Sequence, residues 1–136
     1  MKPVFVDSSG FFAHLASADP FHEQAVALFQ QAKAERWRLF TTNAVVFETY
    51  ALLLYRTRKG RANALAFLDS IERGFCSIER LSAQDEIRAG VILRSHEDKM
   101  YSLCDAASFV VMDRLGIQEA IAFDRRFHEY GRFIVL

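Results

Sequence analysis

Short apolar segments alternate along this chain with longer segments of helical periodicity, and this alternation limits its possible folds more than any other feature. Helical segments separate the first four apolar segments from one another, and no hairpin signal joins two of the apolar segments. Strands connected through helices pair in parallel, because a crossover of that length returns the chain to the same edge of the sheet. The sequence therefore predicts an α/β fold, in which a central parallel sheet of four to five strands is flanked by helices.

The expected elements follow from apolar runs, turn residues and helix caps. We expect strands at 3–6, 37–42, 75–81, 119–123 and 133–136, and helices at 11–16, 20–36, 44–58, 62–71, 83–96 and 103–115. Residues 7–10 are predicted to form a turn. Asp19, Asn43 and Ser82 are expected to cap the helices that follow them, and Gly116 is expected to end the last one.

Length and composition fit one ordinary globular domain that spans residues 1–136. Formal net charge is zero, which excludes a chain that binds nucleic acid through overall positive charge. Cys76 and Cys104 lie in no zinc-binding spacing, and we expect reduced thiols. No segment resembles a signal peptide or a transmembrane helix, so we expect a cytoplasmic protein with no membrane partner.

Two acidic residues follow predicted strands directly: Asp7 after the first and Asp124 after the fourth. Sites in parallel sheets form at the carboxyl ends of the strands, so these two acids would share a cleft if their strands are neighbours. The alternative is that each residue only caps the next turn.

Glu48 interrupts an apolar helix, since its neighbours three and four residues away are Ala44, Val45, Ala51 and Leu52. Ionised carboxylates are rarely buried without a partner or a metal ion, which favours a functional role. The alternative is a side chain near the helix start that reaches water.

Asp105 lies in the first turn of the last long helix, where Ser102 and Asp105 also form a capping-box pattern. Capping and function are equally plausible for this residue. Asp113 lies about 80° around the same helix and ~12 Å along it, so we expect an outer or surface position for it.

A cluster of these carboxylates would need a cation or protonation, because two of them ~4 Å apart repel by about 4 kcal/mol at an effective dielectric constant near 20. Oxygen ligands alone favour Mg²⁺ or Mn²⁺, and such ions support phosphodiester hydrolysis. No pair of histidines has a zinc-binding spacing.

Four segments carry a resemblance to a known family. The chain resembles the PIN domain family and, within it, toxin ribonucleases of the VapC type. The segments are Val4-Phe5-Val6-Asp7-Ser8-Ser9, Thr42-Asn43-Ala44-Val45-Val46-Phe47-Glu48-Thr49, Leu103-Cys104-Asp105-Ala106-Ala107-Ser108 and Ala122-Phe123-Asp124-Arg125-Arg126-Phe127.

The resemblance implies a three-layer PIN-like fold with four acids, Asp7, Glu48, Asp105 and Asp124, converging on Mg²⁺ or Mn²⁺. It also implies hydrolysis of RNA phosphodiester bonds by a metal-activated water, a homodimer and a small antitoxin partner.

Small hydroxyl residues often support the site in this family, and Ser8 or Ser9 falls on such a position. Many members also have Thr or Ser two residues before the last acid, where this chain has Ala122. A hydroxyl that would support Asp124 is therefore missing from the sequence.

Two groups of basic residues are candidates for phosphate binding. Arg125 and Arg126 adjoin Asp124, with Arg132 near them. Arg56, Arg58, Lys59 and Arg61 form a run at a helix end, where the alternative is solvated surface that suits the helix dipole.

The leading functional prediction is a Mg²⁺- or Mn²⁺-dependent endoribonuclease that acts as the toxin of a toxin–antitoxin pair. One alternative is a catalytically weak PIN-like module that binds RNA or a protein. Another is an RNA-processing nuclease without an antitoxin.

Overall fold

Five parallel strands form one sheet in the order β3-β2-β1-β4-β5 in the computed structural model, which describes residues 1–136. The strands are β1 (Pro3–Val6), β2 (Arg38–Thr42), β3 (Ser77–Glu79), β4 (Glu119–Ile121) and β5 (Ile134–Val135). Every neighbouring pair is parallel, which confirms the predicted sheet. The chain order reverses beside β1, so the carboxyl ends of β1, β2 and β4 meet at the point where ligands bind in open α/β sheets.

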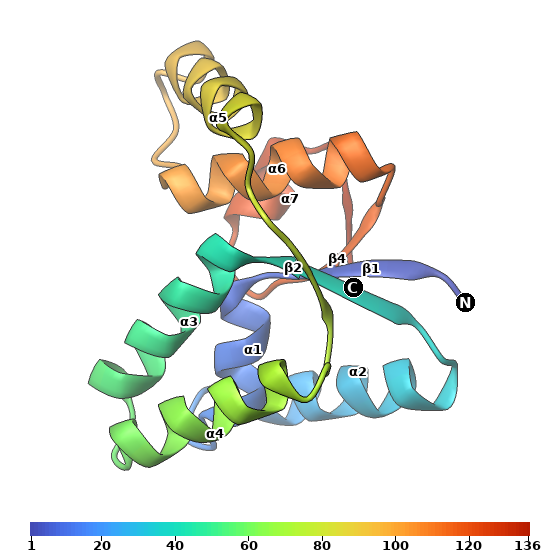
Figure 1. Cartoon of the computed structure of the whole chain (residues 1–136), viewed down its shortest axis with the longest axis vertical. Helices are drawn as coiled ribbons and strands as arrows, with labels where there is room; N and C mark the ends of the chain where they lie inside the picture. The colour runs from blue at the N-terminus through green and yellow to red at the C-terminus, as the bar shows by residue number, and fades with distance from the viewer.

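Helices cover both faces of this sheet, which gives the three layers of Figure 1. The seven helices are α1 (Ser8–Leu15), α2 (His22–Ala34), α3 (Asn43–Arg56), α4 (Gly60–Glu72), α5 (Ala83–Ser95), α6 (Leu103–Leu115) and α7 (Arg126–Tyr130). The first four lie below the sheet in Figure 1, and α5, α6 and α7 lie above it. No helix combines the length and apolar character needed to cross a bilayer.

Phenylalanine rings fill much of the core between the layers. Phe5, Phe11, Phe67, Phe109 and Phe127 are each at most 1% exposed. The ring centroids of Phe109 and Phe127 lie 5.0 Å apart in an edge-to-face arrangement. These rings bury large apolar areas and hold the helical layers against the sheet.

The predicted turn at 7–10 is wrong, because α1 begins at Ser8 immediately after β1. Asp7 caps this helix by accepting a hydrogen bond from the Ser9 backbone N–H. A Cβ atom at Gly10 would lie 2.7 Å from the carbonyl oxygen of Ile121. Glycine therefore lets α1 pass close to the end of β4, which brings the segments after the two strands together.

Two predicted caps have different partners in the structure. The side chain of Thr42, not Asn43, caps α3, and Asn43 accepts a hydrogen bond from the distant Leu81 N–H instead. Asp19 accepts from Phe21 N–H, and α2 begins only at His22. The sequence marks Asn43 and Asp19 as polar residues at helix starts, but it does not determine their hydrogen-bond partners.

The caps of α5 and α6 agree with the prediction. Ser82 forms a capping box with Asp85, and Ser102 forms one with Asp105. Gly116 ends α6 in the left-handed conformation that glycine adopts without strain. The short helix α7 was not predicted.

Candidate active site

The neighbouring strands β1 and β4 bring Asp7 and Asp124 to one edge of the sheet. Val6 pairs with Ile121, and the Asp7 N–H donates to the Ile121 carbonyl oxygen at 3.1 Å. Asp7 therefore lies directly beside the chain that continues to Asp124. This placement meets the condition that the sequence analysis set for a shared cleft.

A cavity of about 380 Å³ opens at this edge, between α1, α3, α6 and the start of α7. The side chains of Glu48, Asp105 and Asp124 all line it. The remaining lining residues are Ser8, Ser9, Phe12, Asp19, Leu52, Arg56, Ser102 and Arg126. The structure thus gathers acids from three segments that are far apart in the sequence.

Asp7, the fourth predicted acid, is only 1% exposed and is not among the residues that line the cavity, although the charges of Asp124 and Asp105 act on it. Its Oδ2 accepts hydrogen bonds from the Ser9 hydroxyl at 2.7 Å and from the Ser9 N–H at 3.3 Å. Its Oδ1 is buried and has no hydrogen-bond partner. Burial, followed by the charges of Asp124 and Asp105, raises the pKa of Asp7 to about 8 against the opposing effect of Ser9.

Asp105 is 5% exposed, and its Oδ2 accepts from the Ser102 N–H at 2.8 Å in the capping box. Burial raises the pKa of this carboxyl, and the charge of Asp124 adds to the rise, against the opposing effects of Ser102 and Arg126. Capping and site placement are therefore not alternatives for Asp105. The cap fixes the side chain in an orientation from which it also lines the cavity.

Arg126 supplies the positive charge beside these acids. Its Nε lies 3.2 Å from Asp105 Oδ2, and its Nη1 lies 3.8 Å from Asp124 Oδ2. Its backbone N–H also donates to Asp124 Oδ1 at 3.0 Å. In this arrangement no three Asp, Glu, His or Cys side chains form a complete set of metal ligands. A guanidinium group joins two of the carboxylates instead.

Glu48 reaches the cavity from α3, although not from a fully buried face. Its neighbour Val45 is buried, whereas Ala51 is exposed, so the apolar sequence around Glu48 overstated its burial. The Glu48 carboxylate faces the Cys104 thiol. Burial, followed by the charge of Glu48 and a hydrogen bond to it, raises the pKa of Cys104, which keeps this thiol protonated.

The comparisons with known proteins identify the family of this chain. The family model for the PIN domain matches residues 4–133, nearly the whole chain. The chain belongs to the PIN domain family. The resemblance seen in the sequence is therefore confirmed.

Two PIN relatives are similar over most of their length. The 23S rRNA-specific endonuclease VapC20 of Mycobacterium tuberculosis is 37% identical over 131 residues, which cover 94% of each chain. A VapC ribonuclease of Archaeoglobus fulgidus is 31% identical over 127 residues, which cover 91% of this chain and 78% of the relative.

Solved structures show the same PIN fold. The crystal structure of M. tuberculosis VapC20, described as a sarcin-ricin loop cleaving toxin, matches with a TM-score of 0.82 and 33% identity over 95% of each chain. VapBC2 of Rickettsia felis matches with a TM-score of 0.68, 12% identity and coverage of 98% of this chain and 97% of that one. At this identity the second match supports the fold alone.

A hydroxyl from another element, that of Ser9 on α1, lies near the backbone beside Ala122. The Ser9 Oγ donates to Asp7 and accepts a hydrogen bond from the Phe123 N–H at 2.9 Å. One hydroxyl on α1 therefore connects Asp7 to the backbone next to Asp124. Ala122 itself is 3% exposed and packs in the core.

Some residues that line the PIN-domain cavity were not assigned to it from the sequence. Arg56 was considered only as part of a basic run, yet it lies eight residues after Glu48 with Leu52 between them, which forms one stripe along α3. An eight-residue separation alone does not identify it, since Asp113 has the same separation from Asp105 and does not line the cavity. Asp19 also reaches the cavity, from the loop after α1, and no sequence signal places it there.

Other candidates lie away from the cavity. Arg125 is exposed, and only its neighbour Arg126 lines the cavity. Asp113 is exposed on α6, as expected.

The predicted supporting residues do lie at the cavity: Ser8 is buried and lines it together with Ser9.

Proposed function

We propose that this protein is a Mg²⁺- or Mn²⁺-dependent endoribonuclease and the toxin of a type II toxin–antitoxin pair. The observation that carries the proposal is the buried Asp7 Oδ1, which has no hydrogen-bond partner and precedes Ser8 and Ser9 of a cavity that Asp19, Glu48, Asp105 and Asp124 also line. A buried, unpartnered carboxylate is costly unless it is protonated or a cation binds it, and the raised pKa of Asp7 reflects this cost. The names of the VapC relatives support RNA as the substrate.

The donor groups fit a hard divalent ion. Asp7, Glu48, Asp105 and Asp124 offer only carboxylate oxygens, the ligands that Mg²⁺ and Mn²⁺ favour. These four residues would hold the ion after rotation of Arg126 away from Asp105 and Asp124. A bound ion would supply the activation of a water molecule and stabilise negative charge on the phosphodiester.

The chain itself orients the reacting groups. Ser9 fixes the Asp7 carboxylate, and the Ser102 N–H fixes that of Asp105. Arg126 lines the same cavity and, once released from the acids, could bind a non-bridging oxygen of the RNA phosphate. Prior orientation of this kind reduces the reorganisation needed during the reaction.

Partner proteins are part of the proposal. A toxin ribonuclease needs an inhibitor in its own cell, and a small antitoxin that covers the acidic cavity would act in this way. Large apolar side chains stand exposed on the helices, Phe47 at 72% and Tyr55 at 82% on α3 and Ile87 at 61% on α5. Such exposure supports association with a second copy in a homodimer or with the antitoxin.

The test is cleavage of RNA by the purified protein. We expect ribosomal RNA, in total RNA and in intact ribosomes, to be cut with Mg²⁺ or Mn²⁺ present and to stay intact with excess chelator. The variant Asp105→Asn should reduce the rate of RNA cleavage by at least about 100-fold. This loss would exceed the roughly 10- to 100-fold loss that is usual when a residue supporting a metal ligand is replaced. Equal cleavage with chelator, or by this variant, would refute the proposed mechanism.

A further inference from the structure

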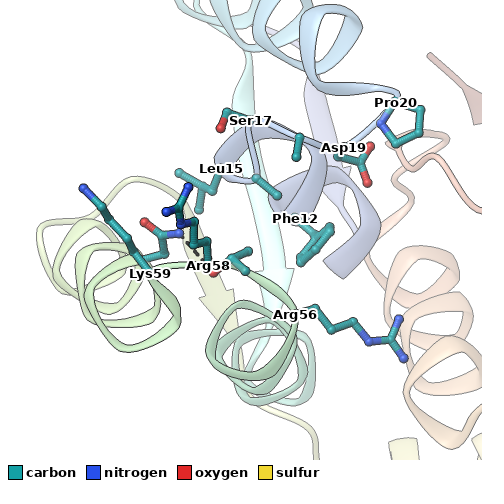
Figure 2. Close-up of a pocket in the computed structure, with 12 residues that line it drawn as sticks. Phe12, Leu15, Ser17, Asp19, Pro20, Arg56, Arg58 and Lys59 are labelled. Atoms are coloured by element: carbon teal, nitrogen blue, oxygen red, sulfur yellow. Dashed lines mark hydrogen bonds between the residues drawn. The ribbon is translucent and has the colours of Figure 1, made fainter.

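A second and larger hollow lies beside the acidic cavity and has no place in the function proposed so far. It has a volume of about 690 Å³, within the usual range of ligand-binding pockets. Its walls are the end of α1 with the following loop, and the 57–59 turn that joins α3 to α4 (Figure 2). We call it the α1–α4 groove.

The α1–α4 groove is continuous with the acidic cavity. Phe12, Asp19 and Arg56 line both. Figure 2 shows the Arg56 side chain extending away from Arg58 and Lys59, toward the helices on the far side of the acidic cavity. A ligand held among the acids could therefore continue past Arg56 into this groove.

Unpaired positive charge lines the groove. Arg56, Arg58 and Lys59 contribute their side chains to it, and none of the three forms an ion pair. The one acidic lining residue, Asp19, uses an oxygen to cap the Phe21 N–H. The whole chain has zero net charge, so these cations form a local positive patch and do not reflect an overall positive charge of the protein.

Local contacts fix the backbone of the turn that carries Arg58 and Lys59. The Thr57 hydroxyl donates to the Leu53 carbonyl oxygen at 2.6 Å, and the Asn63 amide donates to the Thr57 hydroxyl at 3.0 Å. A Cβ atom at Gly60 would collide with the Leu54 carbonyl oxygen, so glycine permits the close turn. The turn that carries Arg58 and Lys59 is thus fixed before any ligand binds, which lowers the entropic cost of binding.

We propose that the α1–α4 groove binds the single-stranded RNA backbone adjacent to the phosphate that is cut. Arg56 contacts RNA at the junction with the acidic cavity, and Arg58 and Lys59 bind phosphates farther along the strand. This inference rests on the proposed ribonuclease function and adds a substrate-binding site to it. RNA fits better than an acidic protein segment because the groove opens directly into the site of cleavage.

Binding without metal separates this site from catalysis. We would measure fluorescence anisotropy of a 12-nucleotide single-stranded RNA with the full chain in chelator, over a range of salt concentrations. Arg58→Gln combined with Lys59→Gln should weaken binding about 10-fold and reduce the slope of log affinity against log salt by about 1.4, or ~0.7 per phosphate contact. Circular dichroism and melting temperature would check that the variants fold.

A matched control removes the same charge elsewhere. Arg61 and Arg73 are exposed residues near the two ends of α4 that do not line the groove. The Arg61→Gln, Arg73→Gln double variant should bind RNA as the wild type does. If both double variants lose affinity equally, the effect is one of general charge and the groove assignment is wrong.

Cleavage kinetics give the second readout. With Mg²⁺, the groove variant should raise KM for the 12-nucleotide RNA and leave kcat unchanged, whereas a dinucleotide too short to reach the groove should show no change. A wild type that neither binds nor cuts RNA would refute the ribonuclease proposal itself. A wild type that cuts RNA, with a groove variant that binds and cuts equally well, would refute only the groove.

The same anisotropy assay tests the alternative that an acidic protein segment, and not RNA, occupies the α1–α4 groove. Unchanged RNA affinity in the groove variant, with loss of polyglutamate binding relative to wild type, would assign the groove to an acidic protein partner. That result would overturn the RNA proposal.

Discussion

The two oxygens of Asp7 have opposite surroundings, and this difference links the fold to the site. Oδ2 caps α1 and is held by Ser9, whereas Oδ1 is buried without a partner. A carboxylate used only as a cap needs neither deep burial nor a second acid nearby. Asp7 therefore serves the fold through one oxygen, and the other would bind the cation in the function that we propose.

Replacing Asp7 with asparagine should stabilise the metal-free protein while it abolishes cleavage. Asparagine caps helices about as well as aspartate, so the fold should remain. Since the pKa of Asp7 is raised to about 8, its ionisation opposes folding, and wild-type stability should fall as pH rises from about 4 to about 8.

The Asp7→Asn variant lacks this fall, so in chelator its free energy of unfolding at pH 8 should exceed that of the wild type by at least about 1 kcal/mol. Urea unfolding at pH 5 and pH 8 measures the effect. The exposed Asp113→Asn substitution is the control and should change neither stability nor cleavage. A gain for Asp7→Asn that is as large at pH 5 as at pH 8 would contradict the explanation.

Site residues differ in how far the sequence could reveal them. Asp7 and Asp105 stand in recognisable positions after a strand and in a capping box, whereas the separation of Arg56 from Glu48 does not by itself identify Arg56. The sequence could not decide between Arg125 and Arg126. That choice depends on the path of a short helix, which places one arginine in the cavity and the other in solvent.

Among the elements, long periodic helices and apolar strands were predictable, whereas α7 was not. This helix has five residues and only Phe127 buried, too few for a periodic pattern. The strands β3 and β5 are shorter than expected, with three and two residues, because backbone pairing and not apolar sequence decides where a strand ends. The start of α1 was missed because Ser8, Ser9 and Gly10 have turn-forming side chains. The cap at Asp7 and the contact of Gly10 with Ile121 overrule that preference.

An ion-pair network joins the strand β3 to the helices α5 and α6. Arg114 on α6 donates to both oxygens of Asp85 on α5, at 3.0 and 2.8 Å, and to Glu79 on β3 at 2.9 Å. Asp85 also completes the capping box with Ser82 and is 1% exposed. Burial alone would raise the pKa of Asp85, but hydrogen bonds from Arg114 and Ser82 outweigh it and lower the pKa.

Replacing Asp85 with alanine should destabilise the protein by about 2–3 kcal/mol, because the change removes a cap and leaves Arg114 with one partner fewer. A lowered pKa stabilises the fold above the unfolded pKa near 3.9, so the loss should be complete at pH 6 and shrink as pH falls below about 4. Urea unfolding measures it, and the exposed Glu86→Ala is the control. An equal loss for both variants would mean that helix propensity, not the network, causes the effect.

Over the whole molecule, zero net charge conceals a separation of charge. Four acids gather at the carboxyl edge of the sheet, and the unpaired cations of the α1–α4 groove lie next to them. Acids without a cation repel one another, and in this structure Arg126 relieves part of that repulsion. The protein thus uses one of its own side chains as a counter-ion, which a divalent ion bound at the proposed site would displace.

This competition predicts how stability responds to metal. A ligand that binds only the folded state stabilises it by RT ln(1 + [L]/Kd), or about 1.4 kcal/mol at ten times Kd. That free energy corresponds to a rise in melting temperature of about 3–6 °C for a chain of this size.

Arg126→Gln should lower the melting temperature in chelator, because Asp105 and Asp124 lose their counter-ion. The same variant should gain more from 10 mM Mg²⁺ than the wild type does, because no arginine competes for the site. Differential scanning fluorimetry at matched ionic strength, with KCl in place of MgCl₂ as control, measures both effects. Arg125→Gln is the matched variant, since Arg125 is exposed and does not line the cavity, and it should respond to Mg²⁺ as the wild type does. If Mg²⁺ protects Arg126→Gln less than the wild type, then Arg126 helps to hold the ion in place and does not substitute for it.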